Sequence, residues 1–197
     1  MSNQKRPYKM KRRAELEEQT RLRIAESAVE LHGTLGPART SVSAVAERAG
    51  VRRSTVYRHF PDEAALFGAC SSHWMARHPL PDTDRWREIV DPNERLTIAL
   101  KEMYAYYRRG EGMLANLFRD RAVVAVVGEL MGAYDAFLAA TAEVLLAGRG
   151  VRGKARRRTL AAIGHALEFS TWRSLTNGQG LDDSEAADLM SRLVAAA

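Results

Sequence analysis

The chain has 197 residues, of which 46% are hydrophobic, and this length and composition are sufficient to form a buried core. Intrinsic disorder is therefore excluded as the overall state. The formal net charge is +6 at pH 7. Residues 1–60 hold 13 Lys and Arg against 6 Asp and Glu, whereas residues 61–197 hold 17 against 18. This asymmetry indicates an N-terminal module that meets a polyanion, followed by a region with a different task.

Cysteine usage and hydropathy predict a cytoplasmic protein that makes no membrane contact. Cys70 is the only cysteine, which excludes an intrachain disulfide and a multi-cysteine metal site. The charged N-terminus is not followed by the apolar stretch that a secretory signal requires. The most apolar region, residues 122–148, contains Glu129, Asp135 and Glu143, and it predicts a long buried helix rather than a membrane span.

Apolar residues recur at helical spacing in almost every segment between Gly and Pro breaks, which predicts an all-α fold. The predicted helices cover residues 11–32, 42–49, 53–59, 62–77, 85–90, 93–109, 113–120, 122–147, 155–176 and 184–196. The segment 78–84, which contains Pro79 and Pro81, is the expected domain boundary.

Two short predicted helices, 42–49 and 53–59, have the spacing of a helix-turn-helix. Ser41 is a good N-cap for the first helix, and Gly50 lies where the turn requires a left-handed residue. Ala46 is small at the position where the two helices cross. The inward positions that hold the pair together are Val45, Ala49, Val51 and Val56.

The second helix and the residues before it carry groups that hydrogen-bond base edges and phosphates. They are Arg52, Arg53, Ser54, Thr55, Tyr57, Arg58 and His59. We expect Arg53 to make a bidentate contact to a guanine and the Thr55 methyl group to meet a thymine methyl. Tyr57 and His59, later on the helix, are expected to contact the DNA backbone.

The run TSVSAVAERAGVRRSTVYRHFPDEAAL, residues 40–66, resembles the DNA-binding signature of the TetR family of transcriptional repressors. The resemblance covers about residues 20–67. It implies a homodimer whose N-terminal heads bind two half-sites of a palindromic operator in double-stranded DNA, while a C-terminal helical domain binds a small-molecule effector that releases the DNA. The resemblance also places Ser41 and Ser43 at DNA-facing positions.

The same resemblance implies four parts along the chain. They are a basic N-terminal arm (1–13), a helix-turn-helix DNA-binding domain (14–60), a connecting helix (61–77) and a C-terminal effector-binding and dimerisation domain (78–197). Fold class is thus expected to be all-α, with a three-helix DNA-binding domain followed by a helical ligand-binding and dimerisation domain.

Two residues depart from the family pattern. Glu63 stands where the family often has a Lys that contributes to a phosphate contact. Cations of the basic arm are expected to compensate by following the DNA backbone or entering the minor groove. These cations are Lys5, Arg6, Lys9, Lys11, Arg12 and Arg13. His32 replaces a common aromatic residue, and we expect it to be a partly buried packing or capping histidine.

No catalytic residue, metal site or cofactor is expected. Residues 148–155, GRGVRGKA, nearly match a phosphate-binding loop, but Ala155 offers no hydroxyl for magnesium and a predicted helix precedes the loop. The five histidines lack His or carboxylate partners at a ligand spacing, and no Ser lies in a Gly-flanked elbow. We therefore do not expect an enzyme.

Aromatic residues at helical spacing in the C-terminal region fit either a core or the lining of a small-molecule cavity. The residues expected to line such a cavity are Trp86, Tyr104, Tyr107, Phe118, His165, Phe169 and Trp172. His165 is the candidate polar group, on one face with Phe169 and Trp172. Few charges accompany these residues, which predicts a mostly apolar effector.

The last two predicted helices carry more apolar residues than one small domain needs, which indicates a two-fold interface. These residues are Leu160, Ile163, Leu167, Leu175, Leu189, Met190 and Leu193. We therefore expect a TetR-like regulator, most simply a repressor, that forms a homodimer through these helices. Two alternatives stay open: a constitutive DNA-binding regulator without an effector, and a helical oligomerisation or adaptor module with a vestigial helix-turn-helix.

Overall fold

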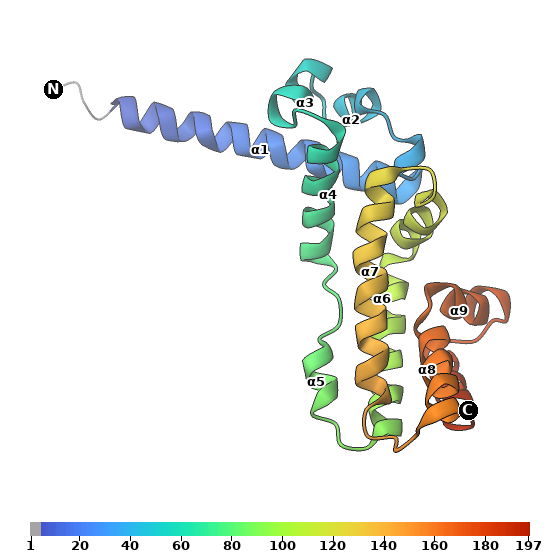
Figure 1. Cartoon of the computed structure of the whole chain (residues 1–197). Helices are drawn as coiled ribbons and strands as arrows, with labels where there is room; N and C mark the ends of the chain where they lie inside the picture. Colours follow the sequence, from blue (N-terminus) through green and yellow to red (C-terminus); the bar gives the residue numbers. More distant parts are fainter. Residues whose placement is uncertain (1–4) are drawn as a thin grey trace. The chain divides into compact units, whose positions relative to one another are not determined.

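The computed structural model describes residues 5–197, with side chains from Met10 onward (Figure 1). About 80% of the chain is helical, and the described residues contain no strand. The elements are α1 (Lys5–Thr34), η1 (Pro37–Arg39), α2 (Val42–Arg48), α3 (Arg53–His59), α4 (Glu63–Arg77), α5 (Thr83–Arg87), α6 (Pro92–Asp120), α7 (Ala125–Leu146), α8 (Gly153–Leu167), α9 (Phe169–Arg173), η2 (Ser174–Gly178) and α10 (Asp183–Ala195). Residues 1–4 of the predicted arm lie outside the described part, as do the side chains of Lys5, Arg6 and Lys9.

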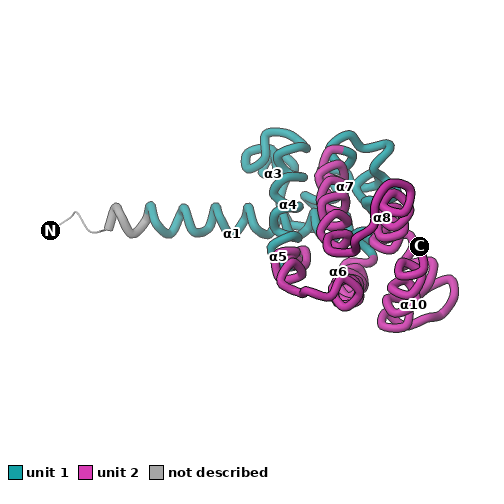
Figure 2. Tube along the Cα trace, turned by 60° about the horizontal axis from the view of Figure 1, so that its bottom comes forward, with its two compact units in different colours: residues 1–77, 112–128 teal, residues 78–111, 129–197 magenta. Residues whose placement is uncertain are grey.

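The chain forms two compact units (Figure 2). Unit 1 contains Met1–Arg77 and Gly112–Gly128, and unit 2 contains His78–Glu111 and Glu129–Ala197. We expected every residue from 78 onward to form one domain, whereas residues 112–128 pack within unit 1. Partners more than 80 residues earlier in the sequence hold them there, so a division drawn along the chain misses them.

The core of unit 1 consists of buried apolar side chains from α1, α2 and α3 and from the residue after α3. Ile24 and Ala28 of α1, Val45 of α2, Val56 of α3 and Phe60 after α3 are almost fully buried. Helices α2 and α3 have seven residues each, a length that is unstable in isolation. They persist because burying a side chain such as Val56 contributes about 1.5–3 kcal/mol.

The end of α6 holds the connection from α1 to α2. Asn116 donates a hydrogen bond to the carbonyl oxygen of His32 at 2.9 Å. Asp120 Oδ2 accepts one from the Ala38 amide at 3.0 Å. Arg119 also donates to the Asp120 carboxylate, and this hydrogen bond lowers the carboxyl pKa. The connection before α2 is therefore fixed by α6, far along the sequence.

Two glycines allow the end of α6 to lie close to the end of α1 and the connection that follows it. Gly36 has a φ of +93°, and a Cβ there would lie only 1.9 Å from Arg119 Nη2. Gly112, inside α6, faces the Gly33 carbonyl oxygen, which a Cβ would meet at 3.3 Å. The prediction of separate helices at 93–109 and 113–120 is wrong, because Gly112 permits contact with α1 instead of ending the helix.

Two buried tyrosines of α6 explain where α8 ends. Tyr104 Oη donates to the carbonyl oxygen of Ala166 at 2.8 Å, and Tyr107 Oη donates to that of Leu167. These hydroxyls satisfy carbonyl groups that a helix end leaves without amide donors. The backbone turns at Glu168, where ψ is 135°, and α9 begins at the next residue. The predicted single helix 155–176 is therefore wrong.

Helix α7 is apolar, but only a minority of its residues are buried. By length and composition alone, this helix of 22 residues is apolar enough to cross a membrane, since its most apolar 18-residue stretch has a mean hydropathy of 1.2; 22% of that stretch is buried. Its exposed face is made of small residues such as Ala133, Ala136 and Ala140, together with Glu129 and Glu143. The prediction of a long buried helix is wrong, because alanines raise the mean hydropathy without supplying large side chains.

His32, near the end of α1, is buried in unit 1. Its ring lies 5.5 Å from the ring of Phe67, and its Nδ1 is 3.5 Å from Cys70 Sγ. Burial lowers the pKa of His32 to about 4 and raises the pKa of the Cys70 thiol to about 12. Both groups are therefore neutral at pH 7, and the predicted packing role of His32 is confirmed.

Acidification is expected to destabilise unit 1 through His32. Its folded-state pKa of about 4 lies below the ordinary value of 6.5, so the unfolded chain binds more protons between these values and stability falls with the pH. Urea titrations should show a loss of about 2 kcal/mol in the free energy of unfolding between pH 7 and pH 5. His32→Phe should remove this loss, while His165→Phe, at an exposed position, should keep it. An equal loss in His32→Phe would contradict the account.

Candidate nucleic-acid interface

Local hydrogen bonds fix the turn between α2 and α3. Ser41 Oγ accepts a hydrogen bond from the Ala44 amide at 3.1 Å and so caps α2. Gly50 has a φ of +64°, a conformation that favours glycine. The Val51 amide donates a hydrogen bond to the carbonyl oxygen of Ala46 at 2.9 Å. The capping role of Ser41 and the turn role of Gly50 are thus confirmed.

Burial divides α3 into an inward and an outward face. Val56 is buried, as is Phe60 just beyond the helix. Seven of the nine residues predicted to face DNA are exposed: Ser41, Ser43, Arg52, Arg53, Ser54, Tyr57 and Arg58. Thr55 and His59 are half-buried, and the Nε2 of His59 is not presented at the surface. Residues 52–59 hold three arginines and no carboxylate, which suits a phosphate backbone.

Arg53 and Tyr57, one helical turn apart, hold each other on the outward face. Arg53 Nη2 donates to Tyr57 Oη at 3.1 Å, and the guanidinium carbon lies 5.4 Å from the centre of the tyrosine ring. The hydrogen bond raises the pKa of Arg53. The i, i+4 spacing of the two residues is a signal in the sequence for this contact, which the separate roles expected for them did not include. Tyr57 therefore restrains the side chain expected to read a base.

Two arginines of α1, not singled out in the sequence, support this helix pair from behind. Arg23 Nε donates to the carbonyl oxygen of Ala49 at 3.0 Å, at the end of α2. The guanidinium carbon of Arg21 lies 4.9 Å from the centre of the Phe60 ring. Neither contact could be predicted from local spacing, because Ala49 lies 26 residues from Arg23 and Phe60 is also far from Arg21 in the sequence.

The start of α4 follows the predicted pattern. Asp62 Oδ1 accepts a hydrogen bond from the Ala65 amide at 2.7 Å, and the helix extends to Arg77 as expected. Glu63 is exposed in the first turn, where a carboxylate suits the helix dipole. It is close enough to Arg53 to contribute to that residue's raised pKa. A carboxylate at this place opposes a nearby phosphate rather than binding it.

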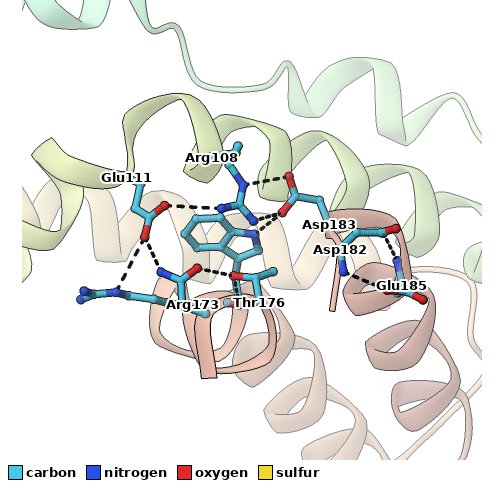
Figure 3. Close-up of polar contacts among 9 residues, drawn as sticks. Arg108, Glu111, Arg173, Thr176, Asp182, Asp183 and Glu185 are labelled. Atoms are coloured by element: carbon cyan, nitrogen blue, oxygen red, sulfur yellow. Dashed lines mark hydrogen bonds and ion pairs between the residues drawn. The ribbon is translucent and has the colours of Figure 1, made fainter. Parts of the chain in front are cut away.

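Four of the seven residues predicted to bind an effector form one packed cluster in unit 2. They are Tyr104, Tyr107, Phe169 and Trp172. Neighbouring rings of this cluster have centroids 5.4 to 6.2 Å apart, and all four side chains are almost fully buried. Trp172 Nε1 donates to Asp183 Oδ1 at 2.9 Å, and the Arg108 guanidinium lies 4.7 Å over the indole. Arg108 in turn pairs with Asp183, as Figure 3 shows.

The remaining three predicted effector residues are placed elsewhere. Trp86 is buried on α5, and Phe118 belongs to unit 1 rather than unit 2. His165 is exposed. Its expected place on one face with Phe169 is wrong, because the backbone turns at Glu168 between them.

Residues 148–155, which resemble a phosphate-binding loop, follow α7 and include the first three residues of α8, so the segment before them is a helix. The described part of the chain, 5–197, holds no group of three or more His, Cys, Asp or Glu side chains that could bind a metal ion.

The residues of this candidate interface match a known protein family. The family described as "Bacterial regulatory proteins, tetR family" matches residues 24–70, which contain α2, α3 and the start of α4. No curated protein sequence matches the chain.

Solved structures share the fold over most of the chain. A TetR-like transcriptional regulator from Rhodococcus sp. RHA1 is 22% identical, with a TM-score of 0.62 over 90% of this chain and 93% of that chain. NalD, the secondary repressor of the MexAB-OprM multidrug efflux pump in Pseudomonas aeruginosa, is 23% identical, with a TM-score of 0.59 over 92% and 96%. AibR, in complex with isovaleryl coenzyme A and operator DNA, is 17% identical, with a TM-score of 0.64 over 88% and 97%.

The geometry of α2 and α3 defines a helix-turn-helix protein. Together with the family match over residues 24–70, it identifies this part of the chain as the DNA-binding domain of a tetR-family transcriptional regulator. The all-α fold with an N-terminal helix-turn-helix domain is thereby confirmed.

Arg53→Ala is expected to lower affinity for the specific DNA site by roughly 10- to 100-fold and to relax the preference at one base pair, because it removes a bidentate contact to a base. Fluorescence anisotropy on the specific site and on single-base variants measures both effects. Arg77→Ala serves as the control, since Arg77 is an exposed cation of α4 that pairs with Glu26. Unchanged affinity and base preference in Arg53→Ala would show that this side chain does not read the groove.

Proposed function

We propose that the chain is a repressor that binds a palindromic operator as a homodimer, with α3 of each copy in a major groove. The observation that carries this proposal is the outward face of α3, where Arg52, Arg53 and Arg58 are exposed with no carboxylate among them. A short helix packed on a second one is the usual reader of a half-site. NalD, which shares the fold, is described as a repressor. Such a regulator acts in the cytoplasm and catalyses no reaction.

The proposed DNA contacts extend beyond α3. On α2 and at its start they include Ser43 and Ser41. On the helical arm, Lys11, Arg12 and Arg13 are exposed and add cations that offset the carboxylate at Glu63. Because cations near phosphates release counterions on binding, these residues contribute to affinity without reading sequence.

The proposed dimer forms through α8 and α10. Leu189 and Leu193 lie four residues apart on α10, and both are exposed. Leu160 and Leu175 are half-buried, whereas Ile163, Leu167 and Met190, which we expected to add to the interface, are buried inside unit 2. The exposed leucines support a contact between two copies, because covering them removes apolar surface from water.

The proposed effector is a small, mostly apolar molecule that binds in unit 2. AibR has been solved with both isovaleryl coenzyme A and operator DNA, so a protein with this fold binds a small molecule as well as its operator. In this chain the cluster of Tyr104, Tyr107, Phe169 and Trp172 offers aromatic surface, but its side chains are packed on one another. A ligand among them has to separate these rings, which couples binding to a change of conformation.

The proposed function is tested by selecting bound sequences from a random pool of DNA duplexes. We expect an inverted repeat bound by two copies of the chain, with affinity that falls steeply as salt rises, since each neutralised phosphate adds about 0.9 to the slope of log affinity against log salt. Light scattering of the complex gives the stoichiometry. Recovery of sequences without two-fold symmetry, or affinity insensitive to salt, would contradict the proposal.

Control by an effector is tested with a panel of aromatic carboxylic acids and short-chain acyl-coenzyme A esters. An active compound should weaken operator binding by about 5- to 150-fold, the usual range of allosteric coupling, and change tryptophan fluorescence. Trp172→Phe should lose the fluorescence change because Trp172 lies in the cluster, whereas Trp74→Phe, on α4, should retain it. A compound that releases DNA while Trp172 emission stays constant would place the effector elsewhere.

A further inference from the structure

Helices α1 and α4 cross inside unit 1 and leave an open cleft between them (Figure 1). Its volume is about 430 Å³, within the range of about 300–1,000 Å³ that is usual for small-molecule sites. Glu26 of α1 pairs with Arg77 of α4 at 3.1 Å, so the two helices are also joined by an ion pair. Both walls of the cleft belong to unit 1, whereas the aromatic cluster belongs to unit 2.

Small side chains form the apolar part of the lining. They are Ala25, Ala65, Gly68 and Ala69. Gly68 is exposed, and a Cβ there would meet no atom within 4 Å, so the cleft is open above this residue. Leu22, which is 43% exposed, adds a larger apolar side chain. A planar ring laid on such a lining removes its apolar surface from water.

The polar residues that α4 contributes to the lining are Ser72 and His73. Ser72 Oγ donates its proton to the carbonyl oxygen of Gly68 at 2.9 Å, so the hydroxyl can only accept a hydrogen bond from a ligand. His73 Nε2 is buried and lies 3.5 Å from Glu26 Oε1, which leaves other atoms of the imidazole ring to line the cleft. This side of the cleft therefore suits a ligand that donates hydrogen bonds.

The charges of α1 favour a cation in the cleft. Glu18 lines it, is exposed, and forms no ion pair with the side chains that the structure describes, Met10–Ala197. The neighbouring Glu17, by contrast, pairs with Arg13 at 3.2 Å. Arg21 also lines the cleft, but its guanidinium carbon lies 4.9 Å from the centre of the Phe60 ring. An unpaired carboxylate attracts a cation, and a planar amidinium can donate two parallel hydrogen bonds to it.

We propose that the cleft between α1 and α4 binds a small aromatic cation, an amidine or a primary amine, with its ring on the small side chains and its charged group at Glu18. Because Arg21 lines the cleft and also contacts Phe60, the occupant restrains a side chain that supports α3. The site belongs to the same unit as the helix-turn-helix. It does not depend on the effector proposed for unit 2.

Isothermal titration calorimetry of the full chain with benzamidine tests the site. A probe of this size is expected to bind with a dissociation constant of about 1 mM. Benzamide and benzoate have the same ring, with a neutral and an anionic group in place of the amidinium. Benzamide should bind about fivefold more weakly, and benzoate more weakly still, because Glu18 attracts the first less and repels the second.

Two pairs of variants locate the probe. Gly68→Leu fills the cleft and should abolish detectable benzamidine binding. Gly132→Leu, at an exposed glycine of α7 where a Cβ also meets no atom within 4 Å, should leave binding unchanged. Glu18→Gln should weaken binding by about fivefold, whereas Glu15→Gln, at an exposed carboxylate outside the lining, should change it little.

Hydrogen exchange tests the link to α3. With benzamidine at about ten times its dissociation constant, the amides of residues 53–60 should exchange up to about tenfold more slowly, because opening of this part of unit 1 then requires release of the ligand. The amides of α10 provide the control, since this helix belongs to unit 2 and should be unaffected.

The possible outcomes are distinct. Absence of benzamidine binding, or binding that survives Gly68→Leu, would overturn the site. Benzoate that binds as tightly as benzamidine would overturn the choice of a cation. Unchanged exchange of α3 with the site occupied would overturn the link through Arg21 to Phe60. Recognition of the operator is tested separately by the selected DNA, so its failure would not be confused with any of these results.

Discussion

Burial of Val56 and Phe60 against α1 and α2 is the interaction on which the proposed DNA-reading surface depends. Helix α3 has only seven residues and has no stability of its own in water. With these two side chains buried, Arg53, Ser54, Tyr57 and Arg58 are exposed, while Thr55 and His59 are half-buried. Arg21 and Arg23 of α1 strengthen this arrangement from behind, one over the Phe60 ring and one at the end of α2. Base reading and packing thus use opposite faces of one short helix.

Helix α6 is the second support, and both units depend on it. In unit 1 its last turns hold the connection before α2 through Asn116 and Asp120. In unit 2 its tyrosines satisfy the carbonyl oxygens at the end of α8. Helix α6 belongs to both units, with residues 92–111 in unit 2 and residues 112–120 in unit 1.

Features set by local chemistry could be predicted from the sequence. The Ser41 cap, the Gly50 turn and the start of α4 at Asp62 each depend on residues within four positions. The continuity of α6 could not be predicted, because Gly112 resembles a helix breaker until the α1 carbonyl that it faces is known. The break at Glu168 depends in the same way on hydroxyls about 60 residues away. The expected effector residues share only their aromatic character and helical spacing, which cannot distinguish a packed cluster from a cavity.

Hydroxyl-radical footprinting of the chain on its selected DNA tests the central claim most directly, because it shows where α3 of each copy meets the helix. The account predicts two protected patches related by two-fold symmetry, on one face of the DNA and about one helical turn, or a multiple of it, apart. Substitution of Arg53 should weaken both patches equally. A single protected patch, or uniform protection along the duplex, would contradict a dimer that reads two half-sites.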